Sequence, residues 1–174
     1  MAVTIALLGN PNSGKTTLFN RLTGSRQHVG NFPGVTVEKK EGELRNNEGV
    51  VVVDLPGIYS LSPYSAEEVV ARDFLMKDKP DVVIDVVDAT NLQRNLYLTV
   101  QLMEIGVPTV VALNMIDEVK RQGKRIDVPL LSKRMGLPVV AISAASGQGY
   151  EELIECALER TRKKIALPCP EMGS

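Results

Sequence analysis

The stretch Gly9-Asn10-Pro11-Asn12-Ser13-Gly14-Lys15-Thr16 decides the fold of this chain. It has the spacing G-x-x-x-x-G-K-S/T, it follows an apolar run over residues 3–8, and it opens a helical pattern over residues 16–22. In this strand–loop–helix context, the backbone N–H groups of the loop face phosphate oxygens at the positive end of the helix. Lys15 then reaches the β- and γ-phosphate oxygens, and the hydroxyl of Thr16 is a ligand for the Mg²⁺ that bridges them. The predicted phosphate-binding residues are Gly9, Asn10, Pro11, Asn12, Ser13, Gly14, Lys15, Thr16 and Thr17.

Apolar runs and helical patterns alternate along the rest of the chain, which is typical of crossover units in a mostly parallel sheet. We expect strands over residues 3–8, 35–44, 50–54, 82–87, 107–113 and 137–142. We expect helices over residues 16–22, 66–77, 92–105, 116–122, 128–135 and 150–164, and a loop over residues 24–34. The turn Asn46-Asn47-Glu48-Gly49 predicts a hairpin. The pattern predicts an α/β fold with a six-stranded, mostly parallel sheet, one antiparallel edge strand and helices on both faces.

Length and composition indicate one globular domain, because the chain has 174 residues, of which 44% are hydrophobic and 24% charged. We expect the domain to occupy residues 1–165 and a disordered tail residues 166–174, where Pro168 and Pro170 break regular structure. The net charge of −1 predicts no nucleic-acid partner. The apolar runs are far shorter than the roughly 20 residues that span a bilayer, so the fragment itself is expected to be soluble.

A second phosphate-site element is Asp54-Leu55-Pro56-Gly57, which stands at the end of a predicted strand. The Asp54 carboxylate can hold Mg²⁺ and the backbone N–H of Gly57 can approach the γ-phosphate, because ligands of open α/β sheets bind at the carboxyl ends of strands. Thr36, in the loop between the two elements, is predicted to give Mg²⁺ a second hydroxyl. The alternative for Thr36 is simple β-propensity at the start of a strand.

The element Asn114-Met115-Ile116-Asp117 predicts the base that is recognised, since it is similar to the N-K-x-D element of GTPases. Asp117 can accept hydrogen bonds from guanine N1–H and the 2-amino group, donors that adenine lacks, and a mismatched base would leave a buried carboxylate unpaired. Asn114 is expected to bond the base and brace the phosphate loop. Met115 replaces the usual Lys and can supply the same apolar contact to the base. Ser143-Ala144-Ala145 matches the S-A-x element that faces guanine O6.

These elements stand in the order seen in Ras-like P-loop GTPases, and more specifically the chain resembles the G domain of the FeoB ferrous-iron transporters. The closer resemblance rests on residues 9–20 and on two further stretches, Val29-Gly30-Asn31-Phe32-Pro33-Gly34-Val35-Thr36-Val37-Glu38 and Asp54-Leu55-Pro56-Gly57-Ile58-Tyr59-Ser60-Leu61. The resemblance implies a Ras-like P-loop fold that binds GTP and GDP. It also implies a parent protein with a membrane-embedded transporter portion, and a place on the cytoplasmic face of the bacterial inner membrane. The sequence leaves the oligomeric state open.

The hydrolytic apparatus lacks a side chain that could orient the attacking water, because Ile58 stands where Ras-type enzymes have Gln. The predicted catalytic groups are therefore Lys15, the backbone of Gly57, Thr36 and a positive charge from outside. The resemblance implies K⁺ in that role, held by Asn12. Two alternatives stay open: Asn12 stabilises the turn, or Arg26 acts as an internal finger. Hydrolysis without further activation is expected at about 10⁻³ to 10⁻² s⁻¹.

Three functions compete at this point. The first is a slow, Mg²⁺-dependent and K⁺-stimulated GTPase that regulates ferrous iron uptake. The second is a ribosome- or RNA-associated GTPase, which predicts an attached RNA-binding domain and a basic face; the short basic clusters at residues 120–125 and 160–164 are more typical of solvated faces. The third is a nucleotide-sensing module with negligible hydrolysis, which the missing Gln favours.

Overall fold

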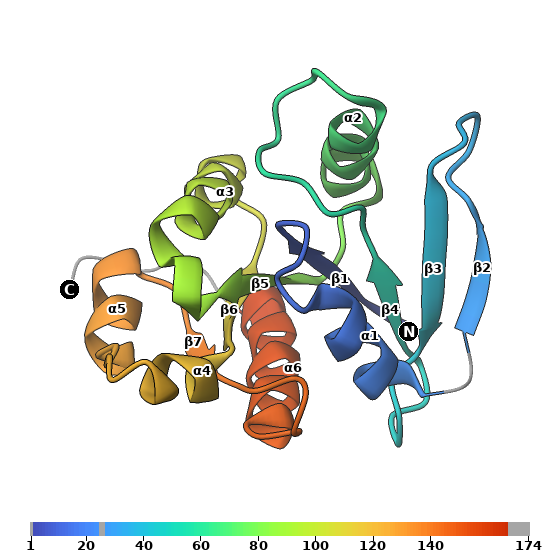
Figure 1. Ribbon diagram of the computed structural model, residues 1–174. Coiled ribbons are helices and arrows are strands. Elements are labelled where there is room, and N and C mark those ends of the chain that lie inside the picture. Colours follow the sequence, from blue (N-terminus) through green and yellow to red (C-terminus); the bar gives the residue numbers. More distant parts are fainter. Residues whose placement is uncertain (1, 25–26, 167–174) are drawn as a thin grey trace.

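Seven strands form one sheet in the computed structural model, which describes residues 2–24 and 27–166, with side chains through Arg162. The spatial order of the strands is β2-β3-β4-β1-β5-β6-β7 (Figure 1). The pairs β2–β3 and β3–β4 are antiparallel, and all the others are parallel. The strands are β1 (Val3–Gly9), β2 (Gln27–Asn31), β3 (Glu38–Glu43), β4 (Val50–Asp54), β5 (Val82–Asp88), β6 (Thr109–Asn114) and β7 (Val139–Ala141).

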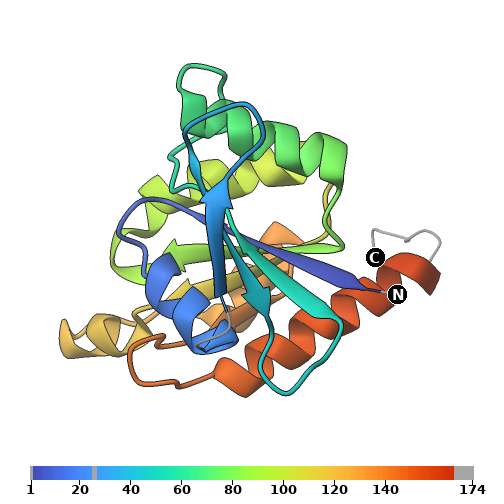
Figure 2. The same ribbon diagram turned by 90° about the vertical axis from the view of Figure 1, so that its right-hand side faces the viewer.

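Helices cover both faces of the sheet, because the buried strands carry apolar side chains on both sides. Helices α1 and α6 lie on one face of the sheet, and α2 and α3 lie on the other (Figure 2). In β1, Ile5 and Leu7 belong to the core on the first face, whereas Ala6 and Leu8 belong to the core on the second. The helices are α1 (Lys15–Thr23), α2 (Ala66–Asp73), α3 (Leu92–Ile105), α4 (Ile116–Arg121), α5 (Val128–Met135) and α6 (Tyr150–Ala166), and a π-helical turn, Phe74–Asp78, continues α2. In the described part of the chain, none of these helices combines the length and the apolarity that crossing a bilayer requires.

The expected α/β architecture is confirmed, but the number of strands is not. The hairpin between β3 and β4 forms as expected, with Asn46 and Gly49 at φ of 60° and 86°. The structure adds β2 inside the stretch expected to be a loop, so the sheet has two antiparallel pairs, β2–β3 and β3–β4. Gln27–Asn31 is polar and largely exposed, and it is a strand because β3 pairs with it from Gly42 to Glu38. Such tertiary pairing overrides weak local propensity.

The topology brings three of the motifs to one edge of the sheet. The parallel strands β1, β4 and β6 end at Gly9, Asp54 and Asn114 respectively. Since parallel strands have their carboxyl ends on the same side, the loops that follow these residues lie next to one another.

A buried carboxyl group in the centre of the sheet makes the stability of the fold depend on pH. Asp85 of β5 is 1% exposed, and its Oδ2 accepts a hydrogen bond from the Thr99 hydroxyl of α3. Burial raises the pKa of Asp85 from 3.8 to about 7, and the hydrogen bond from Thr99 opposes part of that rise. Between pH 3.8 and about 7, the Asp85 carboxyl group therefore keeps its proton in the folded protein and loses it in the unfolded chain.

Asp85→Asn is expected to remove a pH dependence from the stability. In the parent chain, the free energy of unfolding should fall as the pH rises from 3.8 to about 7 and stay level above it. Asparagine keeps an acceptor for Thr99 and does not ionise, so its advantage should grow to about 4 kcal/mol at pH 8. Urea unfolding at pH 5 and pH 8 measures this, with the exposed Asp78→Asn as the control. Parallel pH profiles for the parent chain and Asp85→Asn would contradict the assignment.

Candidate nucleotide-binding site

The phosphate loop joins β1 to α1 and borders a cavity of about 490 Å³. The loop runs straight from a buried strand into the first turn of a helix, so its N–H groups stand at the positive end of α1. Gly57 and Met115 reach the same cavity from two other loops. The remaining lining residues are Asn10, Pro11, Asn12, Gly14, Lys15, Thr16 and Thr17.

Asn114 is the first residue of the Asn114–Asp117 base-recognition loop. Its side chain joins this loop to the phosphate loop and to the second base-recognition loop, Ser143–Ala145. Its Nδ2 donates to the carbonyl of Ser13 at 2.9 Å, and its Oδ1 accepts from the N–H of Ala144 at 2.9 Å. The side chain is 3% exposed, so both bonds are shielded from water. Gly14, at φ 94°, packs so closely on the Asn114 amide that a Cβ at position 14 would collide with it. One buried amide thus sets the spacing between the phosphate loop and the Ser143–Ala145 loop.

Two polar side chains of the phosphate loop are buried without a hydrogen bond among the described residues. These are the amide of Asn10, which is 3% exposed, and the hydroxyl of Ser13, which is 1% exposed. Buried polar groups in proteins are nearly always bonded to protein, water or a ligand. Asn10 lines the phosphate cavity and Ser13 does not, so it is Asn10, with the N–H groups of the loop, that suits a strongly polar ligand such as a phosphate chain.

Lys15 and Asp54 form a buried ion pair at the edge of this cavity. Their Nζ and Oδ1 atoms are 2.5 Å apart, and the two side chains are 9% and 8% exposed. Burial raises the pKa of Asp54 above its ordinary value of 3.8, and the charge of Lys15 opposes part of that rise. Asp54 pairs with Lys15, and Thr16, the next residue after Lys15, lines the phosphate cavity; a carboxylate and a hydroxyl are ligands that suit a hard cation. This donor set fits Mg²⁺.

Gly57 lies directly on the phosphate loop. A Cβ at this position would stand 3.2 Å from the Cα of Pro11, so glycine allows the close approach. The next residue, Ile58, donates its N–H to the carbonyl of Gly9 at 3.1 Å. Its side chain is 3% exposed in the core, so it does not face the cavity. Only backbone from this loop is available to the phosphate site at positions 57 and 58.

Thr36 does not lie with the other predicted Mg²⁺ ligands. It is exposed in the turn between β2 and β3, where Phe32 donates its N–H to Val37 at 2.9 Å. Phe32 is 5% exposed and packs edge-on against Phe74, with ring centroids 6.2 Å apart. Thr36 is absent from the lining of the phosphate cavity. Its hydroxyl could reach a metal beside Thr16 only if this turn moved.

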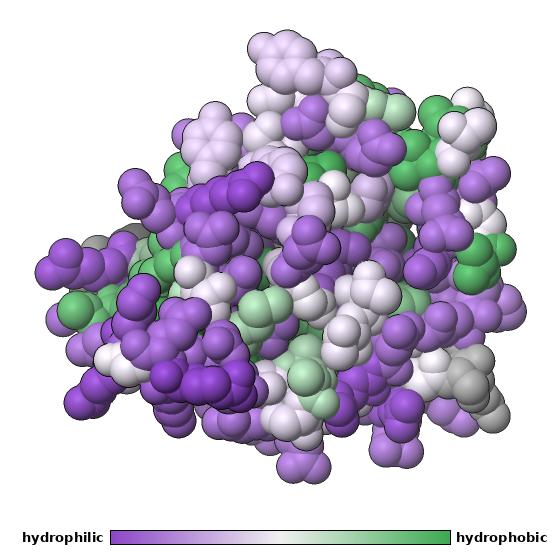
Figure 3. Space-filling view, in the orientation of Figure 1, coloured by the Kyte–Doolittle hydropathy of each residue, from purple (hydrophilic) through white to green (hydrophobic). Residues whose placement is uncertain are grey.

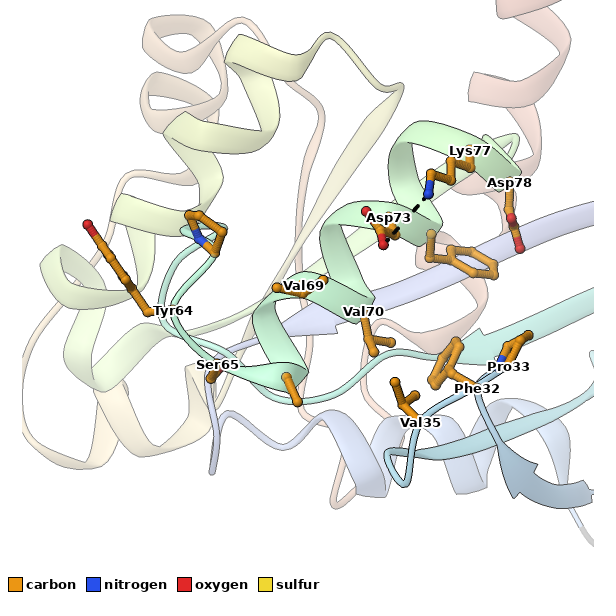
Figure 4. Close-up of a pocket in the computed structure, with 13 residues that line it drawn as sticks. Phe32, Pro33, Val35, Tyr64, Ser65, Val69, Val70, Asp73, Lys77 and Asp78 are labelled. Atoms are coloured by element: carbon orange, nitrogen blue, oxygen red, sulfur yellow. Dashed lines mark ion pairs between the residues drawn. The ribbon is translucent and has the colours of Figure 1, made fainter.

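A second cavity, of about 520 Å³, separates the β2–β3 turn from α2. Phe32 and Val35 of the turn lie opposite Val70 of α2, and the ion pair between Asp73 and Lys77 lies on its rim (Figure 4). The lining is mainly apolar, and none of the phosphate-loop residues belongs to it. The two cavities are therefore separate, and only the first has the donors that a nucleotide requires.

The base-recognition loops stand beside the phosphate cavity. Met115 takes the left-handed conformation, at φ 66°, and lines that cavity. Asp117 is exposed in the first turn of α4, and one of its carboxylate oxygens accepts from the Ser143 hydroxyl at 3.3 Å. Asp117 was expected to be a buried carboxylate. In this structure, therefore, an unpaired Asp117 carboxylate has a free-energy cost only when a bound base shields it from water.

Arg21 is a positioning residue that sequence reasoning missed. From the last turn of α1 it donates through Nε to the carbonyl of Ala144 at 2.8 Å and through Nη2 to that of Ala145 at 2.9 Å. These bonds hold the backbone of the loop in which Asn114 accepts the Ala144 N–H. Since 123 residues separate Arg21 from Ala144, no local pattern could have indicated the pair. Arg26, the alternative finger, lies outside the described residues.

Comparisons with known proteins agree with this geometry. A family model described as ferrous iron transport protein B matches residues 3–157. The chain belongs to the FeoB family. It is 53% identical over 163 residues to the Fe(2+) transporter FeoB of Salmonella typhimurium, covering 91% of this chain and 21% of that protein. It is 49% identical over 170 residues to an FeoA/FeoB fusion protein of Porphyromonas gingivalis, covering 95% and 20%.

Solved FeoB structures have the same fold. A GDP-bound S. thermophilus NFeoB variant superposes with a TM-score of 0.90 at 53% identity, covering 97% of this chain and 66% of that one. The G domain of T. maritima FeoB gives a TM-score of 0.85 at 46% identity, covering 92% and 99%. The chain is thus the N-terminal G domain of this family, with its GTPase-type, Ras-like fold. It spans about a fifth of the length of the curated relatives.

Proposed function

We propose that this domain binds guanine nucleotides and hydrolyses GTP slowly, and that it thereby regulates ferrous iron uptake by an FeoB-type transporter. The observation that carries the proposal is the bridge made by Asn114, because it sets the Asn114–Asp117 and Ser143–Ala145 loops at a fixed distance from the phosphate loop. The full-length relatives are named as Fe(2+) transporters. Attachment to a membrane-embedded portion, on the cytoplasmic face of the inner membrane, is therefore part of the proposal.

The residues at or beside the phosphate cavity each have a task in hydrolysis. Lys15 must leave Asp54 and turn to the phosphate oxygens, so nucleotide binding exchanges one ion pair for another. Thr16 and Asp54 would hold Mg²⁺, with Thr36 added after movement of its turn. When bound, Mg²⁺ neutralises charge on the phosphate oxygens. Gly57 lines the phosphate cavity, so we expect its backbone N–H to stabilise charge that develops on the γ-phosphate.

The role proposed for Asn12 is to hold K⁺, which would supply the missing positive charge. The side chain is exposed at the phosphate cavity, and its amide oxygen is a suitable ligand. The structure also offers a simpler reason for asparagine, since its backbone is left-handed at φ 67°. Asparagine and glycine adopt that conformation more easily than other residues do.

Asn12→Gly and Asn12→Ala separate these two roles. Both remove the amide, but only alanine strains the left-handed backbone. GTP turnover is measured with Mg²⁺ in matched potassium and sodium buffers. If K⁺ binds the side chain, the parent domain is faster in potassium and both variants lose that stimulation. Stimulation that survives in Asn12→Gly would assign Asn12 to the turn, and equal rates for the parent domain in both salts would remove K⁺ from the mechanism.

The sensing module remains the second candidate, because Ile58 is buried and gives the site no water-orienting side chain. This candidate would be favoured if GTP were hydrolysed no faster with the domain than without it in both salts, and if GDP bound tightly. The RNA-associated alternative has less support. The surface over α4 is strongly hydrophilic (Figure 3, lower left), but Arg121 of the basic cluster is paired with Glu118.

A further inference from the structure

The segment that follows Gly57 is attached to two helices through specific side chains. The N–H of Leu61 donates to Oε1 of Gln101 on α3 at 2.7 Å, and its carbonyl accepts from Nη1 of Arg72 on α2 at 3.2 Å. Leu61 itself is 2% exposed in the core. Ser60 donates its hydroxyl to Glu68 of α2 at 2.8 Å. The segment thus runs between α3 and α2 with both its backbone and its side chains engaged (Figure 1).

The side chain of Tyr59 contacts Arg94 of α3. The guanidinium carbon of Arg94 lies 4.3 Å from the centroid of the Tyr59 ring, well within the range of a cation–π contact. Arg94 is in the first turn of α3, and Tyr59 is two residues after Gly57. Both side chains are exposed, so the contact has a modest energy and can be removed without disturbing the core.

Helix α3 is a rigid support for these contacts. Leu98 and Leu102 are 0% exposed against the sheet. The amide of Asn95, 4% exposed, accepts from the N–H of Asp88 at 3.1 Å and donates to the carbonyl of Asn91 at 2.9 Å. These bonds fix the start of α3 to the end of β5. A side chain on this helix therefore has a defined position relative to β1 and the phosphate loop.

We propose that Arg94 and Gln101 are positioning residues that hold Tyr59–Leu61 against α3 and so keep the Gly57 N–H at the phosphate cavity during turnover. On the other side, the bond from Ile58 to Gly9 fixes the same segment to the phosphate loop. Because the site has backbone rather than a polar side chain at positions 57 and 58, the rate depends on how firmly that backbone is held. The inference rests on the proposed GTPase function.

Steady-state GTP hydrolysis by Arg94→Gln tests the contact with Tyr59. The expected result is a kcat lower by about two- to fivefold, the range for one exposed cation–π contact, with KM and GDP affinity unchanged. Tyr59→Phe keeps an aromatic face and should keep the parent rate. Tyr59→Leu should match Arg94→Gln, and adding Arg94→Gln to it should have no further effect. Arg134→Gln, an exposed arginine on α5, is the control for charge.

An unchanged kcat in Arg94→Gln would overturn the proposal. It would also be overturned if Arg94→Gln lowered kcat equally in the parent domain and in the Tyr59→Leu variant. A GDP affinity that falls together with kcat would indicate a general structural role instead and would likewise overturn it.

Amide hydrogen exchange in the GDP complex gives a readout that does not depend on turnover. Arg94→Gln and Gln101→Leu should both speed exchange over residues 57–62 and leave exchange over residues 10–17 unchanged. In Gln101→Leu the amide of Leu61 should be most affected, because the Gln101 oxygen that accepts its hydrogen bond is gone. If the parent domain does not hydrolyse GTP, the proposed function fails and exchange alone decides whether the segment is held. Equal exchange over residues 57–62 in parent and variants would show that these residues do not hold it.

Discussion

Asp117→Asn is expected to change the base preference of the site from guanine to xanthine. Asp117 offers two acceptors to guanine, which presents N1–H and a 2-amino group. Asparagine offers one acceptor and one donor, which match the N1–H and 2-oxo group of xanthine. Asparagine keeps one of the two acceptors, and a hydrogen bond to a charged group contributes about 1.5–3 kcal/mol, so the loss of one such bond should weaken GDP binding by roughly 10- to 10²-fold. The same variant should bind xanthosine diphosphate more tightly than the parent chain does.

Titration of GDP, inosine diphosphate and xanthosine diphosphate against both proteins measures this exchange of preference. Inosine lacks only the 2-amino group, so the parent domain should bind it with an affinity between the other two. Asp117→Ala, which has neither donor nor acceptor, should bind all three weakly. Retention of GDP preference by Asp117→Asn would show that the carboxylate does not meet the base, and Ser143, which bonds to Asp117, would then hold it for a structural reason.

Lys15→Met should reduce GTP turnover by about 10²- to 10³-fold, the effect of removing one preorganised charge stabiliser. Methionine keeps the length of the side chain but loses the ammonium group. The substitution also leaves Asp54 in a site where it is 8% exposed without its partner, which is expected to cost about 3 kcal/mol at pH 8. Single-turnover hydrolysis measures the first effect and urea unfolding the second.

The stability effect of Lys15→Met has a definite sign with pH. Burial already raises the folded-state pKa of Asp54 above its value of 3.8, and loss of the Lys15 charge raises it further. The free energy of unfolding of the variant then falls as the pH rises from 3.8, the ordinary pKa of Asp54, to its raised pKa in the folded variant. The variant should therefore be closest in stability to the parent chain at low pH. Lys15→Met/Asp54→Asn should recover stability without recovering turnover. Recovered turnover in the double variant would trace the original loss to Asp54 rather than to the missing ammonium group.

The motifs could be predicted from the sequence because each is a short contiguous stretch of residues. The phosphate loop, Asp54–Gly57 and Asn114–Asp117 all stand at the ends of apolar runs that form strands, and the parallel order of those strands follows from the alternation of strand and helix. Fold class and family followed from these motifs. The strand β2 was missed because its polar residues have no buried face, and pairing with β3 is what makes it a strand.

The sequence by itself determined the type of ligand, because loop glycines, Lys15 and Asp117 carry their chemistry in their residue types. The sequence predicted that Asn114 braces the phosphate loop, and the structure confirms it through Ser13; the other contacts between distant loops appeared only in the tertiary structure. Asn114 bridges to Ser13 and Ala144, 101 and 30 residues away, and Arg21 and Arg94 reach loops that no sequence pattern links to them. Tertiary structure also placed Thr36 outside the phosphate cavity and gave Asn12 its left-handed backbone. The physical reason is that residue type sets what a group can bond, whereas packing of distant segments sets which partner is within reach.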